Sequence, residues 1–303
     1  MQQTTPIRGP LVWRDMDQKT LDDAYNQAAY APNMDVTLGR IATASEVARK
    51  TLGVPQRVAY GPSEHERLDI YRATSASGGG KGGSAPVNVF VHGGAWLRSS
   101  AAQTAFTAEA IVGAGAHAVL IDFINVDQSN GDLMPLAEQV SRAIAWAWSN
   151  AESFGGDRNR FFVSAHSSGA HLASCALSRG WRANNLPPDF CKGALLVGGM
   201  YDLEPVRRSA RSAYVKFTDE MEDALSAQRH IDGINTPLML AYGTTETPEF
   251  QRQTRDFFAA LKAKGKTAEL MVAEGYNHFE LFETMANPYG IVGRARLRQM
   301  GLA

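Results

Sequence analysis

The chain has 303 residues, of which 44% are hydrophobic and 20% are charged, and its formal net charge is -1. A chain of this length buries a large hydrophobic core without help from disulfides or metal ions. It lacks a basic run that would neutralise phosphates, so we expect no nucleic-acid partner. No stretch approaches the roughly eighteen apolar residues of a membrane span, and residues 1–10 lack the apolar core of a secretory signal. We therefore expect a cytoplasmic protein with no membrane partner.

The two cysteines, Cys175 and Cys191, belong to no Cys-x-x-Cys pair and to no His/Cys spacing typical of a metal site. We expect both thiols to be buried as small apolar groups, with no structural disulfide and no metal site.

The first part of the chain differs from the rest. Residues 1–52 have mixed helical character and precede a regular alternation of strands and helices. Two early strands are predicted at residues 57–61 and 67–72, joined by a turn. The Gly- and Ser-rich run at 74–85 is predicted to be a loop exposed to solvent.

Six later strands are continuously apolar, which is typical of strands that are buried on both faces. Helices with apolar residues at helical spacing are predicted at about 136–154 and 249–264. The alternation predicts a single α/β domain, residues 1–303, with a mostly parallel sheet and helices on both faces. Residues 1–52 and 201–235 fall outside it, and we expect them to form a partial cap or lid over the carboxyl edge of the sheet. The six strands are predicted at 87–91, 118–122, 161–164, 193–197, 237–242 and 268–272.

A glycine pair follows the strand at 87–91, in the motif His92-Gly93-Gly94-Ala95-Trp96. Acyl transfer places negative charge on a carbonyl oxygen, and fixed backbone N–H groups stabilise that charge effectively. Glycine lets a loop present such donors without side chains in the way. We predict an oxyanion hole made by the N–H groups of Gly94, Ala95 and Ser168, the residue after the candidate nucleophile.

The strand at 161–164 leads into Ala165-His166-Ser167-Ser168-Gly169 and then a helix. A serine at such a strand-to-helix corner projects its hydroxyl out of the sheet beside the free N–H groups of the helix. The corner needs small residues two positions before and after the nucleophile. Ser167 has Ala165 and Gly169 there, so Ser167 is the predicted nucleophile.

Among seven histidines, His278 is the predicted general base. It lies in the loop after the last apolar strand, and such a loop reaches the edge of the sheet that carries the serine. An imidazole takes up and returns a proton near neutral pH.

An acid that orients this histidine is expected between the serine and the histidine in chain order. Glu246, just after the strand at 237–242, is the first candidate. Asp202 follows the preceding strand and is the second. Glu249 comes third, because its place after Pro248 is typical of the first turn of a helix.

These motifs resemble those of the kynurenine formamidase (arylformamidase) branch of the α/β-hydrolase esterases and lipases. The resemblance extends from about residue 60 to residue 279 and includes the segments 92–96, 165–172, 201–203, 246–250 and 277–279. It implies an α/β-hydrolase fold with an eight-stranded sheet and a triad of Ser167, Glu246 and His278, without metal or organic cofactor. The sequence departs from the branch at Ala165, where glycine is usual, and at Ser168, where alanine is usual.

We therefore expect a serine hydrolase that cleaves a small carboxylic ester or an aryl formamide. The alternatives are a hydrolase-fold binding protein without catalysis and a lipase, and a homo-oligomer is one possible assembly. Aromatic side chains near the motifs are candidates for an aromatic-accepting substrate pocket. These are Trp96, Trp181 and Tyr201.

Overall fold

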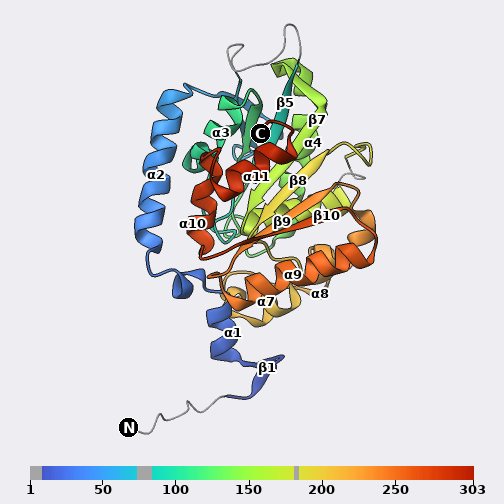
Figure 1. Cartoon of the computed structure of the whole chain (residues 1–303). Coiled ribbons are helices and arrows are strands. Elements are labelled where there is room, and N and C mark those ends of the chain that lie inside the picture. The colour runs from blue at the N-terminus through green and yellow to red at the C-terminus, as the bar shows by residue number, and fades with distance from the viewer. Residues whose placement is uncertain (1–8, 74–83, 181–183) are drawn as a thin grey trace.

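The computed structural model describes residues 9–73, 84–180 and 184–303. Its centre is an eight-stranded sheet with the order β10-β9-β8-β7-β5-β6-β4-β3. Helices lie on both sides of this sheet (Figure 1). β4 runs antiparallel to β3 and β6, and the other neighbouring strands are parallel. The strands are β3 (Gln56–Ala59), β4 (Arg67–Tyr71), β5 (Ala85–Val91), β6 (His117–Ile121), β7 (Gly156–His166), β8 (Gly193–Val197), β9 (Leu238–Gly243) and β10 (Ala268–Ala273).

The mostly parallel sheet with helices on both faces is confirmed. Each predicted strand has its counterpart in this sheet, with ends that differ by a few residues. The largest difference is in β7, which begins at Gly156, before the apolar run. Residues 157–160 are polar and partly exposed, so hydrophobicity did not indicate that they belong to the strand. A small hairpin of β1 (Leu11–Trp13) and β2 (Met16–Asp17) was not predicted.

The two predicted helices correspond to α4 (Met134–Ser149) and α9 (Pro248–Ala263). α4 ends earlier than predicted, because the chain turns through a short 3₁₀ helix, η4 (Ala151–Phe154), to Gly155 with φ of 86°. The other α-helices are α1 (Gln18–Ala24), α2 (Met34–Thr51), α3 (Ala108–Gly113), α5 (Ser168–Cys175), α7 (Glu204–Arg208), α8 (Asp219–Ala224), α10 (His278–Glu283) and α11 (Ile291–Gln299). Shorter turns of helix are η1 (Gln27–Tyr30), η3 (Ala102–Thr107), η5 (Ala176–Gly180), η6 (Ala210–Ala213), η7 (Ala227–Arg229), η8 (Ile231–Gly233) and η9 (Thr284–Ala286).

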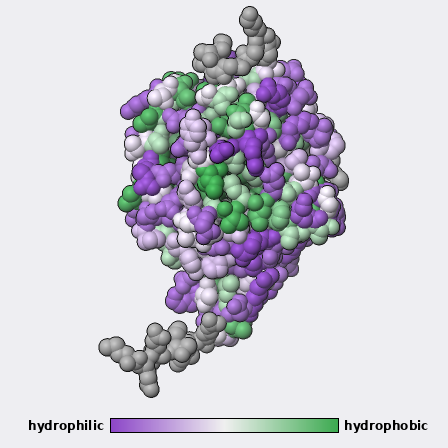
Figure 2. All heavy atoms as spheres, viewed as in Figure 1, coloured by the Kyte–Doolittle hydropathy of each residue, from purple (hydrophilic) through white to green (hydrophobic). Residues whose placement is uncertain are grey.

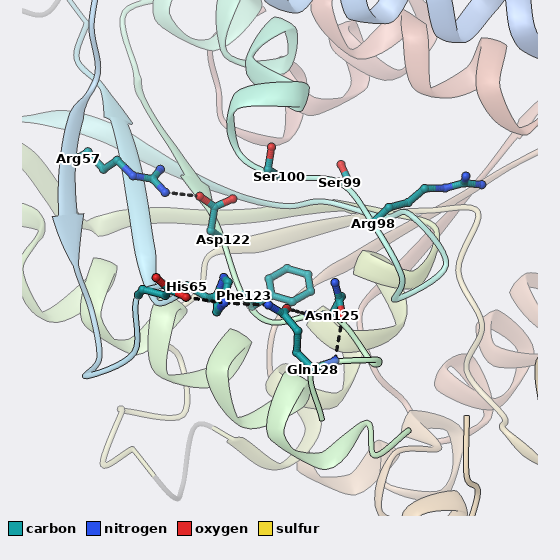
Figure 3. A pocket seen from close by; sticks show the side chains of 10 residues that line it. Arg57, His65, Arg98, Ser99, Ser100, Asp122, Phe123, Asn125 and Gln128 are labelled. Carbon is teal, nitrogen blue, oxygen red and sulfur yellow. Dashed lines mark hydrogen bonds and ion pairs between the residues drawn. The ribbon is translucent and has the colours of Figure 1, made fainter. Parts of the chain in front are cut away.

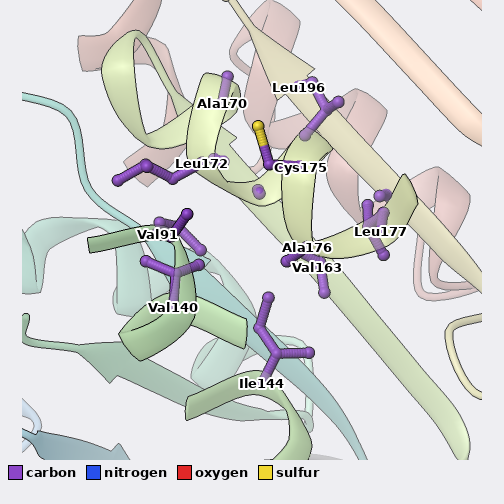
Figure 4. Close-up of a cluster of buried hydrophobic side chains, with 14 of the residues drawn as sticks. Val91, Val140, Ile144, Val163, Ala170, Leu172, Cys175, Ala176, Leu177 and Leu196 are labelled. Atoms are coloured by element: carbon purple, nitrogen blue, oxygen red, sulfur yellow. The ribbon is translucent and has the colours of Figure 1, made fainter. Parts of the chain in front are cut away.

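The hydrophobic core has two layers, one on each face of the sheet. Val163 of β7 packs in one layer and its neighbour Phe162 packs in the other, as the alternation of side chains along a strand requires. Figure 4 shows part of the first layer, where side chains of α4 and α5 meet those of the central strands. Cys175 and Cys191 are free and buried in this layer, and burial raises the pKa of each thiol to about 12.

The two segments outside the alternation lie against the main body. α2 runs along one side of the molecule, and α1 with the β1–β2 hairpin lies toward one end (Figure 1). Residues 201–235 form α7, α8 and three short 3₁₀ helices. Their role as a cap or lid stays a prediction, as does assembly into an oligomer. Most of the predicted loop at 74–85 lies outside the described residues.

The surface is mixed in character. Figure 2 shows apolar side chains near the middle of one face, with polar side chains around them. No helix in the described part of the chain is both long enough and apolar enough to cross a membrane.

Candidate active site

The corner between β7 and α5 is strained at Ser167, which has φ of 58° and ψ of -127°. Such a conformation is rare for a residue with a side chain and persists only where the surroundings enforce it. A Cβ atom on Gly169 would lie 2.3 Å from the carbonyl oxygens of both Val91 and His92, so only glycine fits there. Ala165 is fully buried. The two small residues that identified Ser167 thus lie where strand, loop and helix pack most closely.

Three residues from distant parts of the chain form a hydrogen-bonded row. The Oγ atom of Ser167 lies 2.8 Å from Nε2 of His278, and Nδ1 of His278 lies 3.0 Å from Oε2 of Glu246. A carboxylate only accepts hydrogen bonds, so it favours the tautomer with the proton on Nδ1 and leaves Nε2 to accept from the serine. All three side chains are buried, and Ser167 is the most exposed at 7%.

The other two candidate acids face elsewhere. Glu249 accepts two hydrogen bonds from Arg252, at 2.6 and 2.7 Å, and one from the hydroxyl of Tyr25. Asp202 pairs with Arg229 at 3.3 Å. Of the three acids considered, the structure therefore places Glu246 at the imidazole.

A glycine that the sequence reasoning missed lies beside the acid and the imidazole. Gly198 follows β8 with φ of 55°, and a Cβ atom there would lie 2.9 Å from the His278 ring and 3.0 Å from Oε2 of Glu246. A side chain at this position would push the two apart. The signal in the sequence was a glycine pair directly after a buried strand, the same signal that marked the loop after β5.

The loop after β5 carries three successive residues with positive φ: Gly94 at 108°, Ala95 at 58° and Trp96 at 64°. Among the described residues, neither the Gly94 N–H nor the Ala95 N–H has a hydrogen-bond acceptor. The loop touches the serine, since a Cβ atom on Gly93 would lie 2.9 Å from Cβ of Ser167. Ser168 begins α5, so its N–H is one of those that a helix start leaves without an intrahelical partner. Free donors therefore come from both sides of the serine.

The hydroxyl of Ser168, which alanine would lack, has a definite contact. The backbone N–H of Trp96 donates to Oγ of Ser168 over 3.2 Å. This bond ties the loop after β5 to the first residue of α5. The hydroxyl thus joins the two backbone segments that carry the free donors.

Comparison with known proteins finds hydrolases among the relatives of this chain. A family model described as BD-FAE matches residues 68–185. The kynurenine formamidase of Danio rerio is 26% identical over 95% of this chain and 98% of its own length. A probable isoprenylcysteine alpha-carbonyl methylesterase of Oryza sativa is 27% identical, over 76% of this chain and 58% of its own. The crystal structure of a putative thioesterase from Silicibacter sp. TM1040 matches with a TM-score of 0.75 and 21% identity, covering 90% of this chain and 97% of that chain.

The chain has the α/β-hydrolase fold. It is an enzyme, and its sequence is similar to the formamidase branch over nearly its whole length.

Two other histidines near the serine of this hydrolase are structural. Burial holds the pKa of His166 well below its usual range, and Nε2 of His166 donates to the carbonyl oxygen of His278 over 3.2 Å. Burial lowers the pKa of His171 to about 4. His171 accepts from the indole N–H of Trp96 over 3.2 Å and lies 2.9 Å from the carbonyl oxygen of Leu225. It therefore links the loop after β5 to the 201–235 segment.

Two of the three aromatic residues predicted to contact substrate lie in the described part of the hydrolase, and both are buried. Trp96 is 1% exposed, with Arg211 over its ring at 5.3 Å. Tyr201 is fully buried and stacks on Phe257 at 4.4 Å between ring centroids. Trp181 lies outside the described residues. Contact of these side chains with substrate stays a prediction.

A cavity of about 250 Å³ lies beside the loop after β5 (Figure 3). Arg98, Ser99 and Ser100 line it from that loop, and Asp122 and Phe123 line it from the end of β6. None of the three residues in the hydrogen-bonded row lines it. Its connection to the row is through packing, because the ring of Phe123 stacks on that of His92, just before the glycine pair, at 4.3 Å.

Proposed function

We propose that the hydrolase transfers an acyl group in two steps through Ser167, with His278 as general base and Glu246 as the residue that orients it. The observation that carries the proposal is the unbroken row from Ser167 through His278 to Glu246, with contacts of 2.8 and 3.0 Å. The proposed oxyanion hole consists of the N–H groups of Gly94, Ala95 and Ser168.

In the first step, Nε2 of His278 takes the proton of the Ser167 hydroxyl while Oγ forms a bond to the carbonyl carbon. The carbonyl oxygen then carries the negative charge, which the three N–H groups stabilise. As the oxyanion collapses, the bond to the leaving oxygen or nitrogen breaks, and His278 returns the proton to that atom. An acyl-serine remains. In the second step water attacks the same carbon and gives a proton to His278. The bond between that carbon and Oγ then breaks, His278 returns the proton to Oγ of Ser167, and the acid is released.

The proposed substrate is a small carboxylic ester or an aryl formamide. The similarity to a kynurenine formamidase extends over 95% of this chain and 98% of the relative, which supports testing an aryl formamide first. The methylesterase relative is matched over 58% of its length, which makes a carboxylic ester the second candidate.

The test combines active-site labelling with a substrate panel. A fluorophosphonate probe should label the wild-type serine and fail to label Ser167→Ala. Rates should be compared for N-formylkynurenine, short-chain aryl esters and long-chain triglyceride emulsions. Comparable hydrolysis by Ser167→Ala would disprove the mechanism. Preference for the emulsions would indicate a lipase, and failure of the wild type to react with the probe would contradict serine catalysis.

A further inference from the structure

The N-terminal segment reaches the carboxylate of Glu246 at the oxygen that faces the imidazole. Gln27, in η1, is 7% exposed, and its Nε2 donates to Oε2 of Glu246 over 3.2 Å. This is the same carboxylate oxygen that lies 3.0 Å from Nδ1 of His278. The second oxygen, Oε1, accepts from the N–H of Gly243 over 3.0 Å. Gln27 is therefore one of three partners that hold this carboxylate.

The orientation of the Gln27 amide is set by its two partners. Its Oε1 accepts from the backbone N–H of Thr247 over 3.2 Å, while its Nε2 faces the carboxylate. A flipped amide would place oxygen against carboxylate and NH₂ against N–H, and would lose both bonds. One side chain thus fixes both the carboxylate of Glu246 and the backbone that follows it.

The same segment also holds the start of the helix that carries His278. Asn277 is the N-cap of α10 and forms a capping box with Glu280. Asn33 joins this box: its Nδ2 donates to Oε1 of Glu280 over 2.6 Å, and its Oδ1 accepts from Nδ2 of Asn277 over 2.8 Å. Residues 27–33 therefore form hydrogen bonds with two loops: the loop after β9, which carries Glu246, and the loop after β10, which leads to His278.

We propose that Gln27 is a positioning residue for the acyl-transfer reaction, and that the 27–33 segment makes the N-terminal region part of the catalytic apparatus. Gln27 keeps Oε2 of Glu246 in line with Nδ1 of His278, and Asn33 fixes the turn from which His278 projects. The inference rests on the proposed function and assigns these residues no contact with substrate.

Burial explains why the contact matters. In a buried site the carboxylate cannot replace a lost hydrogen bond with one to bulk water. Without the amide donor, Oε2 of Glu246 keeps only the imidazole and Oε1 keeps only the N–H of Gly243, so the carboxylate is held less firmly in line with Nδ1 of His278. The imidazole is then less well oriented when it takes the proton of the serine, so the effect falls on chemical steps and not on substrate binding.

The experiment compares Gln27→Met, which removes both bonds with little change in volume, with Gln27→Glu. At alkaline pH the glutamate retains an acceptor for Thr247 and replaces the donor with a carboxylate against Glu246. We expect kcat to fall by about tenfold in Gln27→Met and at least as far in Gln27→Glu, with unchanged KM. Wild-type kcat in Gln27→Glu would show that the Thr247 bond alone matters and would overturn the proposal.

Asn26→Ala provides the matched control. Asn26 is exposed, caps η1 through the N–H of Ala28, and forms no hydrogen bond with the acid or base loops in the described part of the chain. Its kcat should stay at the wild-type value. Titration of active sites with the fluorophosphonate probe corrects each kcat for the folded fraction. Equal losses in Asn26→Ala and Gln27→Met would reduce the role of Gln27 to local folding and overturn the proposal.

A double-mutant cycle with Glu246→Gln separates this inference from the proposed mechanism. If Gln27 acts through Glu246, Gln27→Met should cost almost nothing in kcat once Glu246→Gln is present. Additive losses would overturn the positioning role and leave the triad intact. Full activity of Ser167→Ala would instead disprove the triad itself.

Discussion

The two halves of the candidate site lie at the same edge of the sheet but are held by different kinds of contact. At the nucleophile, backbone packs on backbone: Ser167 has a strained φ, and Gly169 lies against the carbonyl oxygens of Val91 and His92. At the acid and base, side chains hold side chains, with Gln27 on Glu246 and Asn33 at the start of α10. The first half is set by short motifs, and the second requires a segment more than two hundred residues away.

The difference predicts how each half fails. Where backbone packs closely on backbone, there is no space for another atom, so a single added methyl group disturbs the fold itself. A hydrogen-bonded side chain can be lost while the fold persists, so its removal lowers the rate before it lowers stability. Measurements of kcat and of stability on the same variants therefore distinguish the two halves.

Among variants that keep the nucleophile, the largest effect on rate is expected from Glu246→Gln. The amide does not provide the carboxylate acceptor that favours the productive tautomer of His278, so kcat should fall by roughly 10³- to 10⁴-fold. Steady-state kinetics measures this, and Asp202→Asn, which changes an acid paired with Arg229, should leave kcat near wild type. A large loss in Asp202→Asn with little in Glu246→Gln would reverse the assignment.

Gly169→Ala tests the backbone half. Its new Cβ would lie 2.3 Å from two carbonyl oxygens, and the free energy of unfolding should fall by about 3 kcal/mol. Gly39→Ala is the control. Gly39 lies in α2, and outside that helix's own backbone nothing lies within 4 Å of a Cβ atom at this position. There alanine should be neutral or stabilising. Urea denaturation gives both values, and equal stability of the two variants would contradict close packing at the elbow.

Acid should weaken the link from the loop after β5 to the 201–235 segment. The unfolded chain protonates His171 near its ordinary pKa of 6.5, while burial lowers the folded pKa to about 4. The stability contributed by neutral His171 is therefore fully present above pH 6.5 and is lost as the pH falls toward 4. The loss is on the order of 3 kcal/mol for this residue. His171→Gln keeps a donor and an acceptor but cannot titrate, so its stability should depend less steeply on pH; an unchanged slope would contradict the prediction.

The smallest effect is expected from Ser168→Ala. It leaves the buried N–H of Trp96 without its acceptor, which should cost about 1 to 2 kcal/mol of stability and lower kcat severalfold. Ser174→Ala removes a hydroxyl from the same helix whose bond is to the carbonyl oxygen of His171, within that helix. Its kcat should remain at the wild-type value. Equal kcat in both variants would show that the Ser168 hydroxyl does not support the loop.

Several features could be predicted because they depend on local sequence. Continuous apolar runs predicted six of the eight strands of the sheet, and small residues around Ser167 predicted the strand-to-helix corner. The polar start of β7 and the β1–β2 hairpin could not be predicted, since neither has the hydrophobic period of a buried strand. Chain order allowed both Glu246, which was ranked first, and Asp202, and the structure is what places the carboxylate of Glu246 at His278.

The sequence by itself determined three features of the site. These are the order of the candidate serine, acid and histidine along the chain, the small residues around the nucleophile, and the glycines of the loop after β5. Each of these depends on residues within one turn or one strand, where backbone sterics act. Only the tertiary structure decided which acid meets the imidazole, why Ser168 carries a hydroxyl, and that Gln27 and Asn33 reach the acid and base loops. Those contacts join residues from distant parts of the chain, and their partners are fixed by how the sheet and the N-terminal segment pack in three dimensions.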